Sequence, residues 1–335
     1  MTERKFFAFF GVCCAAALAF LGLMVCTAYL VTLLPEDTPA RLESAGLIVA
    51  SESEDISQNG GTPSGEYQTE ESVSRAEESA PEARAVVTLD LSRGGGKIYI
   101  QNETAYAVDP AGYFSLPNAA GDITGVQPTV LVFHTHGTES YAEGGTYTEN
   151  ADFRSTDITR NVVAAGEALC DALRQYGIFA VHDLNMYDEG DFSAAYSKSR
   201  AATEEWLKKY PSIRYVLDIH RDSVESGGAA AAATAVIEDK RAAQIMIVVG
   251  TDERAGRHTG WERNFSLAVK LQTALQEISP RLARPIYLRS ASFNQDISPG
   301  ALLIEIGSGG STLAEAEYSA SLLARAMAEC FSAGG

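Results

Sequence analysis

From residue 126 onward, short β-branched runs alternate with segments of helical periodicity. TVLVF (129–133) is followed by residues 161–177, where apolar side chains recur on one helical face and Gly177 is placed to end the helix. The alternation continues in order through IFAVH, AAYSKSRAATEEWLKKY, IRYVLDIH, AQIMIVVG, NFSLAVKLQTALQEI, IYLR, ALLIEIG and TLAEAEYSASLLARAMAEC. This pattern predicts an α/β domain over residues 126–333, with a mostly parallel sheet and helices on both faces.

The segment before this domain has a different pattern. Within residues 85–125, AVVTLDL and KIYIQN are joined through SRGGG. Their apolar alternation and the glycine-rich connection favour a small strand pair or an irregular lead-in. Residues 85–125 are therefore interpreted as a small, strand-rich lead-in.

The N-terminus carries a long apolar run. Residues 1–5 contain Arg4 and Lys5, and residues 6–34 contain no charged side chain. About 20 apolar residues span a bilayer, so residues 6–34 are predicted to be a membrane anchor. The preceding positive charges place the N-terminus in the cytoplasm and the rest of the chain outside it. A cleaved signal peptide is the alternative, although its apolar region is typically about 7–15 residues long.

Charge separates the anchor from the folded part. The chain of 335 residues has a net charge of −18, and residues 36–84 supply half of it, with 12 acidic residues against 3 arginines. A segment so charged and so poor in large apolar residues buries too little surface to order itself, so 35–84 is predicted to be a disordered linker. The acidic balance also argues against a nucleic-acid partner. Cys170 and Cys330 have no metal-binding spacing and are interpreted as buried thiols, with a disulfide as the alternative.

Polar residues follow three of the predicted strands. His134, His136 and Glu139 follow LVF, His220 ends the DIH run, and Glu305 interrupts LLIEIG. Ligands in α/β sheets bind at the carboxyl ends of strands. Two histidines and a carboxylate with an open position are typical of a catalytic zinc site, while satisfied polar residues at strand ends are the alternative.

The two neighbouring histidines compete for the metal. Alternate residues of a strand point to opposite faces, so His134 and His136 cannot easily bind one ion unless the strand has already ended. His134 is the preferred ligand and His136 the alternate. Two further histidines, His182 and His258, are interpreted as surface residues.

Four blocks of sequence carry a family resemblance: FHTHGTESY, DIHRDS, IMIVVGTD with WERN, and FNQDISPGALLIEIGSGGSTLAEA. In this order they resemble the stage II sporulation protein P family of endospore-forming bacteria, over residues 86–330. The resemblance implies a fold similar to that of zinc-dependent N-acetylmuramoyl-L-alanine amidases. It also implies a membrane-anchored enzyme that cleaves peptidoglycan at the muramoyl-L-alanine amide, and at stem-peptide cross-links, during forespore engulfment.

The resemblance also implies partners and a location. The family acts with a lytic transglycosylase, stage II sporulation protein D, and with a polytopic membrane protein. It acts at the mother-cell septal membrane, with the catalytic domain outside the cytoplasm. A catalytically inactive, wall-binding or scaffold protein on the same fold is the alternative.

Carried onto this chain, the resemblance implies a Zn²⁺ ion bound by His134, Glu139 and His220, with Glu305 as the catalytic base. Glu139 replaces a glutamate that the amidases carry near the start of the next helix, where this chain has TRNVV without an acid. Candidate substrate-binding residues are Arg221, Asn294, Gln295 and Tyr141. A salt bridge for Arg221, a turn for the Asn-Gln pair and simple packing for the tyrosine are the structural alternatives.

Overall fold

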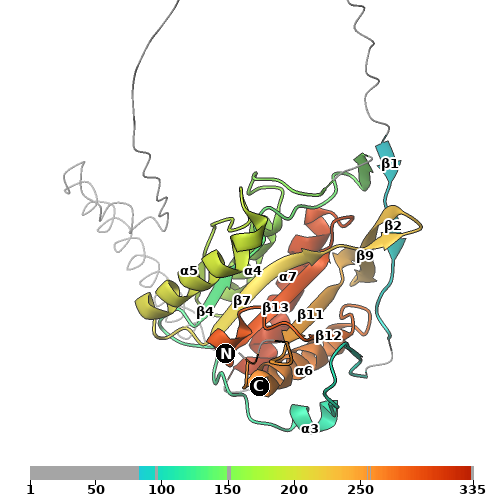
Figure 1. The fold of residues 1–335 in the computed structure, drawn as a ribbon. Helices are drawn as coiled ribbons and strands as arrows, with labels where there is room; N and C mark the ends of the chain where they lie inside the picture. Colours follow the sequence, from blue (N-terminus) through green and yellow to red (C-terminus); the bar gives the residue numbers. More distant parts are fainter. Residues whose placement is uncertain (1–82, 95–96, 149–151, 255, 257, 333–335) are drawn as a thin grey trace, which may run out of the picture. The chain divides into compact units, whose positions relative to one another are not determined.

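A computed structural model of the chain describes residues 83–332, apart from residues 95–96, 149–151, 255 and 257. The predicted cytoplasmic tail (1–5), the anchor (6–34) and all but the last two residues of the linker (35–84) lie outside these residues. Among the described residues, no helix is long and apolar enough to cross a membrane. The described residues form the α/β domain drawn in colour in Figure 1.

A seven-stranded sheet with the order β3-β12-β11-β13-β7-β4-β6 lies at the centre of the domain. Its strands are β3 (Ile100–Asn102), β4 (Val130–Phe133), β6 (Ala180–His182), β7 (Tyr215–Asp222), β11 (Ile245–Gly250), β12 (Ile286–Arg289) and β13 (Ala301–Ser308). All neighbouring pairs are parallel except β11 with β13, so the α/β class is confirmed but the sheet is mixed. Two strands that run in the same direction are usually joined by a crossover that contains a helix. No helix lies between β7 and β11 in the chain, and β11 runs opposite to β7 and β13.

Helices cover both faces of this sheet. α4 (Val162–Gln175), α6 (Trp261–Ile278) and α7 (Leu313–Phe331) pack side by side over one face and close the main core (Figure 1). α5 (Ala195–Lys209) covers the other face at β4 and β7, where Trp206 and Leu207 contact Leu131 and Phe133. The helix over residues 161–177 ends as expected, because Gly177 adopts a positive φ of 72°.

The lead-in contains two short strands, but they do not form a pair. β2 (Val87–Leu89) and β3 do not pair with each other; β2 pairs with β9 (Ala229–Ile237), and β3 joins the edge of the central sheet at β12. Each strand thereby hydrogen-bonds to a larger sheet. This arrangement is more stable than an isolated two-stranded hairpin, which is marginally stable at best in water. The remaining short elements are β1 (Ala83–Ala85), β5 (Thr146–Thr148), β8 (Glu225–Ser226), β10 (Lys240–Ala243), α3 (Pro110–Phe114), η1 (Phe192–Ala194) and η2 (Gln295–Ile297).

The two cysteines of the domain are free thiols. Cys170 on α4 is buried and Cys330 on α7 is half-buried. Burial raises the pKa of both thiols, which keeps them protonated. The interpretation as thiols is confirmed, and the alternative disulfide does not form.

Candidate metal centre

The alternation of side chains along β4 sets the directions of the two neighbouring histidines. Leu131 and Phe133 pack against α5, so Val132 and His134 point to the other face, toward α4. A turn over residues 135–138 then ends the strand and carries His136 to the α5 side. The two histidines therefore lie on opposite sides of the sheet.

Three of the predicted residues meet on the α5 side. Nδ1 of His136 lies 3.6 Å from Oε1 of Glu139, and Nδ1 of His220 lies 3.3 Å from Oε2 of the same carboxylate. One ligand atom from each residue lies within 4.8 Å of the other two. His134, the ligand preferred from the sequence, is not part of this group; the alternate, His136, takes its place.

The ligand atoms of this group are held from behind. Nε2 of His220 lies 2.9 Å from Oδ1 of Asp218, which leaves its Nδ1 facing Glu139. Thr135 fixes the Asp218 carboxylate by donating from its backbone N–H and its hydroxyl. The backbone N–H of Arg221 donates to Glu139 at 3.1 Å. A carboxylate behind a ligating histidine is the usual support in zinc sites, because it fixes the ring and its tautomer.

The electrostatics of this cluster favour a cation. Burial alone would lower the pKa of His220, but the charges of Asp218 and Glu139 outweigh it and raise the pKa well above its ordinary value. Burial would raise the pKa of Glu139, yet the positive His220 ring reverses this and lowers it. The two carboxylates thus stabilise positive charge at His220. Two imidazoles and one carboxylate are also a donor set that zinc accepts, so the residues fit this ion.

Glu305 lies beside the cluster. It is the cross-strand partner of His220 in the β13·β7 pairing, and neighbouring strands lie about 4.8 Å apart. Its Oε2 is buried without a hydrogen bond to any described residue. Burial is the largest cause of its shifted pKa, which is raised to about 8. A carboxyl that readily exchanges its proton near neutral pH is suited to acid–base work.

Aromatic residues that the sequence did not single out form a wall of the site. Phe192 stacks on the His136 ring with centroids 4.4 Å apart, and Tyr196 meets the same ring edge-on at 5.5 Å. The guanidinium of Arg154 lies over Phe192 and is bound by Asp188 at 2.6 Å. Aromatic residues near a helix start carry no chemical signature in a single sequence, so only their placement shows this role.

The four candidate substrate-binding residues make contacts within the protein. Tyr141 is buried, and its hydroxyl donates to the carbonyl of Ile306. Arg221 is also buried and donates from its guanidinium to backbone carbonyls of Ser140, Asp152 and Phe153. These bonds hold the loop that carries Glu139.

Asn294 and Gln295 shape the turn before β13. Asn294 has a positive φ of 55° and donates to the carbonyl of Tyr196. Gln295 is buried and bonds to the backbones of Val248 and Gly250. Of the alternatives considered for this pair, these contacts match the turn.

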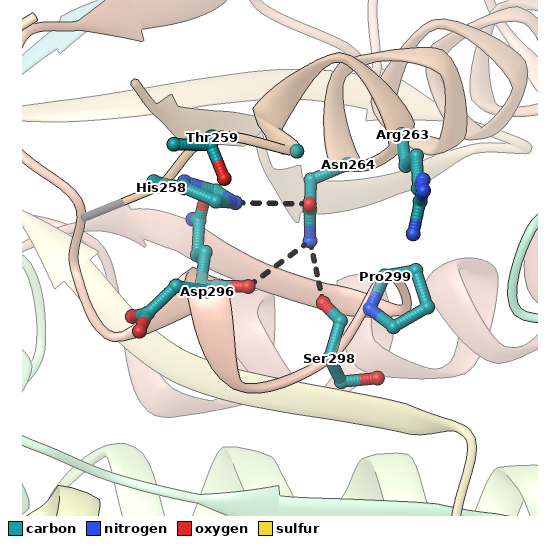
Figure 2. Close-up of a pocket in the computed structure, with 9 residues that line it drawn as sticks. His258, Thr259, Arg263, Asn264, Asp296, Ser298 and Pro299 are labelled. Atoms are coloured by element: carbon teal, nitrogen blue, oxygen red, sulfur yellow. Dashed lines mark hydrogen bonds between the residues drawn. The ribbon is translucent and has the colours of Figure 1, made fainter. Parts of the chain in front are cut away.

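The two histidines interpreted as surface residues are not on the surface. His258 is 2% exposed and hydrogen-bonds to Asn264 beside a cavity of about 270 Å³ at the start of α6 (Figure 2). None of the residues that line this cavity belongs to the group of His136, Glu139 and His220. His182 is packed against His134, with 8% of its side chain exposed. A lone histidine in sequence gives no sign of such packing.

The chain matches the model of a known protein family. The model of the family described as stage II sporulation protein P matches residues 37–328. Stage II sporulation protein P of Bacillus subtilis (strain 168) is 28% identical over 224 residues, which are 62% of this chain and 52% of that protein. The matched part therefore spans about half the length of that relative.

The chain is also similar to solved structures. The N-acetylmuramoyl-L-alanine amidase AmiC2 of Nostoc punctiforme is 13% identical, with a TM-score of 0.39, over 62% of this chain and 97% of that chain. An N-acetylmuramoyl-L-alanine amidase of Clostridium difficile 630 is 18% identical, with a TM-score of 0.36, over 61% and 95%. Scores below 0.5 give no residue-by-residue correspondence.

Proposed function

The chain belongs to the stage II sporulation protein P family, and on this premise we propose that it is a zinc-dependent peptidoglycan hydrolase of sporulation. The observation that carries the proposal is the group of His136, Glu139 and His220 with a proton-exchanging carboxyl, Glu305, on the neighbouring strand. A family of wall enzymes and a site suited to hydrolysis point to the same chemistry.

His136, Glu139 and His220 are the proposed ligands. His136 replaces His134 in this role because both ring nitrogens of His134 already have other partners. Asp218 orients His220, and Phe192 and Tyr196 hold the His136 ring in place. Zinc bound at these residues would supply an activated water near neutral pH and polarise the scissile carbonyl.

Glu305 moves the protons of the reaction. As a carboxylate it accepts a proton from the attacking water, and as a carboxylic acid it returns that proton to the leaving amine nitrogen. A pKa raised by burial suits both steps, and a positioned acid–base group typically contributes about 10²–10⁴-fold to the rate. The Tyr196 hydroxyl has no hydrogen-bond partner among the described residues, so it is free to contact substrate.

The finer features of the proposal come from the sequence. The scissile bond is the muramoyl-L-alanine amide, with stem-peptide cross-links as further targets. Residues 6–34 anchor the enzyme with its N-terminus in the cytoplasm, and residues 35–84 tether the catalytic domain outside, at the septal membrane during engulfment. A lytic transglycosylase like stage II sporulation protein D and a polytopic membrane protein are the proposed partners.

Digestion of purified sacculi tests the proposal. The full chain, purified in detergent and loaded with zinc, should release stem peptides with a free L-alanine amine, identified by mass, and a chelator should abolish this release. Fragments cut between stems would add endopeptidase activity. If no fragment is released while the protein still sediments with sacculi, the inactive wall-binding alternative replaces the hydrolase.

A further inference from the structure

A chain of four polar groups crosses the α4 side of the sheet behind the metal cluster. Nδ1 of His134 lies 2.9 Å from the carbonyl oxygen of Ile219, and its Nε2 lies 2.9 Å from Nε2 of His182. Nδ1 of His182 lies 2.9 Å from Oε2 of Glu167 on α4. The chain therefore joins β7, the end of β4, β6 and α4.

Hydrogen-bond chemistry sets the direction of each bond. A carbonyl oxygen only accepts, so Nδ1 of His134 carries the hydrogen that it shares with Ile219. With that hydrogen on Nδ1, the Nε2 of the neutral, fully buried His134 ring is an acceptor. Nε2 of His182 then donates to it, and Nδ1 of His182 lies 2.9 Å from the Glu167 carboxylate; both nitrogens donate together only in the protonated ring.

His134 links the backbones that carry the two histidines of the proposed centre. Ile219 directly precedes His220 on β7, and His134 lies two residues before His136. The bond from His134 to Ile219 thus connects the backbone that carries one ligand to the backbone that carries the other. The pairing of β4 with β7 ends at Phe133 and Asp218. The bond from His134 to Ile219 therefore continues the connection one residue beyond the end of the strand pairing.

The packing around His134 leaves the ring one position. It is fully buried, and a Cβ placed on Gly166 of α4 would lie 2.7 Å from Nε2 of both His134 and His182. The two rings occupy the space that only a glycine leaves open. A side chain held at both nitrogens and by packing is well suited to keep other groups in register.

Resting on the metal centre proposed above, we infer that His134 is a positioning residue that holds His136 and His220 at the spacing zinc requires. His182 and Glu167 complete the support by fixing the orientation of the His134 ring. Outer residues of this kind typically change metal affinity by about 10–100-fold when they are removed.

Zinc affinity of the full chain, measured by competition with a chromogenic chelator, tests this inference. His134→Ala should weaken zinc binding by about 10–100-fold, because the bond to Ile219 is lost. His134→Asn keeps a side-chain N–H at the place of Nδ1 and should recover most of the affinity. His182→Gln should weaken binding less than His134→Ala, since the bond to Ile219 remains.

His136→Ala is the reference variant and should lose high-affinity zinc. Equal losses for His134→Asn and His134→Ala would overturn the inference, because a metal ligand or a misfolded variant gives that result, and near-wild-type affinity for His134→Ala would overturn it too. Thermal unfolding of each zinc-free variant identifies misfolding. Retention of zinc by His136→Ala would instead refute the proposed ligand set, and the inference with it.

Discussion

At the scale of single residues, the centre depends on a balance between carboxylates in different settings. Asp218 and Glu139 flank His220 and stabilise its positive charge, whereas Glu305 is buried with an unpartnered oxygen. Burial without a partner favours the neutral acid. Carboxylates in one site can therefore have different roles: Asp218 and Glu139 stabilise a cation, and Glu305 exchanges a proton.

Glu305→Gln should separate catalysis from metal binding. The amide cannot take a proton from water, so release of stem peptides should fall by about 10²–10⁴-fold. Zinc content, measured by atomic absorption, should stay at the wild-type level because Glu305 is not a proposed ligand. Wild-type cleavage by this variant would remove Glu305 from the mechanism, and loss of zinc would make it a ligand.

The raised pKa of Glu305 also predicts that the free energy of unfolding depends on pH. The raised pKa of Glu305 means that the folded, zinc-free protein holds a proton that the unfolded chain releases above its ordinary pKa. That stabilising contribution is complete below about pH 4.5 and is lost as pH rises through about 8.

Glu305→Gln mimics the protonated form at every pH. Relative to the wild type, the variant should therefore gain about 4 kcal/mol, or about 8–15 °C in Tm, between pH 5 and pH 8.5. Scanning calorimetry of both proteins in chelator measures this difference. The comparison cancels other titrating groups, among them His134, whose lowered pKa acts in the opposite direction below pH 6.5. A difference that does not change with pH would contradict the buried, protonated state.

At the scale of elements, α4 supports the site from the far face of the sheet. Its residue Gly166 faces the rings of His134 and His182, and Glu167 binds His182. The helix is amphipathic, and its apolar positions pack into the main core. The same face that buries the helix thus also supports the bonds behind the ligands.

Gly166→Ala tests this contact through the sign of its effect. Helix propensity alone predicts that alanine stabilises the protein by about 1 kcal/mol. The structure predicts the opposite, because a Cβ 2.7 Å from two ring nitrogens forces buried groups apart, which typically costs about 1–3 kcal/mol. Urea unfolding gives the free energy of each protein. A more stable variant would show that the two rings do not fill this space.

At the scale of the whole molecule, the α/β domain and the N-terminal segment are proposed to have different roles, hydrolysis for the domain and membrane attachment for the segment. The domain has its own core over the described residues, while the anchor and linker are proposed from the sequence alone. An apolar run with positive charges before it is sufficient to orient a chain in a membrane.

Deletion of residues 1–34 should move the protein from the membrane to the soluble fraction and leave its hydrolysis of purified sacculi unchanged. Immunoblotting after ultracentrifugation measures the first effect, and fragment release per mole of zinc-loaded protein measures the second. A high-salt wash of the full chain is the control, because it releases proteins held only by charge. Recovery of the full chain in the soluble fraction would refute the anchor.

The elements with strong periodicity were predictable. The strands β4, β7 and β13 and the helices α4 and α7 lie where the alternation places them. Thr312 and Glu315 form a capping box at the start of α7. The alanine-rich strand β9 was missed because alanine has no strand signature of its own. The antiparallel direction of β11 could not be predicted, because the orientation of a strand depends on how distant segments pair.

The sequence by itself determined the α/β class, the three strand ends that carry polar residues, and Glu139, His220 and Glu305 as candidates, because periodicity and residue chemistry are local properties. Only the tertiary structure showed that His136, and not His134, lies with Glu139 and His220. Side-chain alternation and the turn after β4 send the two rings to opposite faces of one sheet. It also brought Asp218, Tyr196 and His182 to the site, since contacts between distant segments exist only once the sheet and its helices have packed.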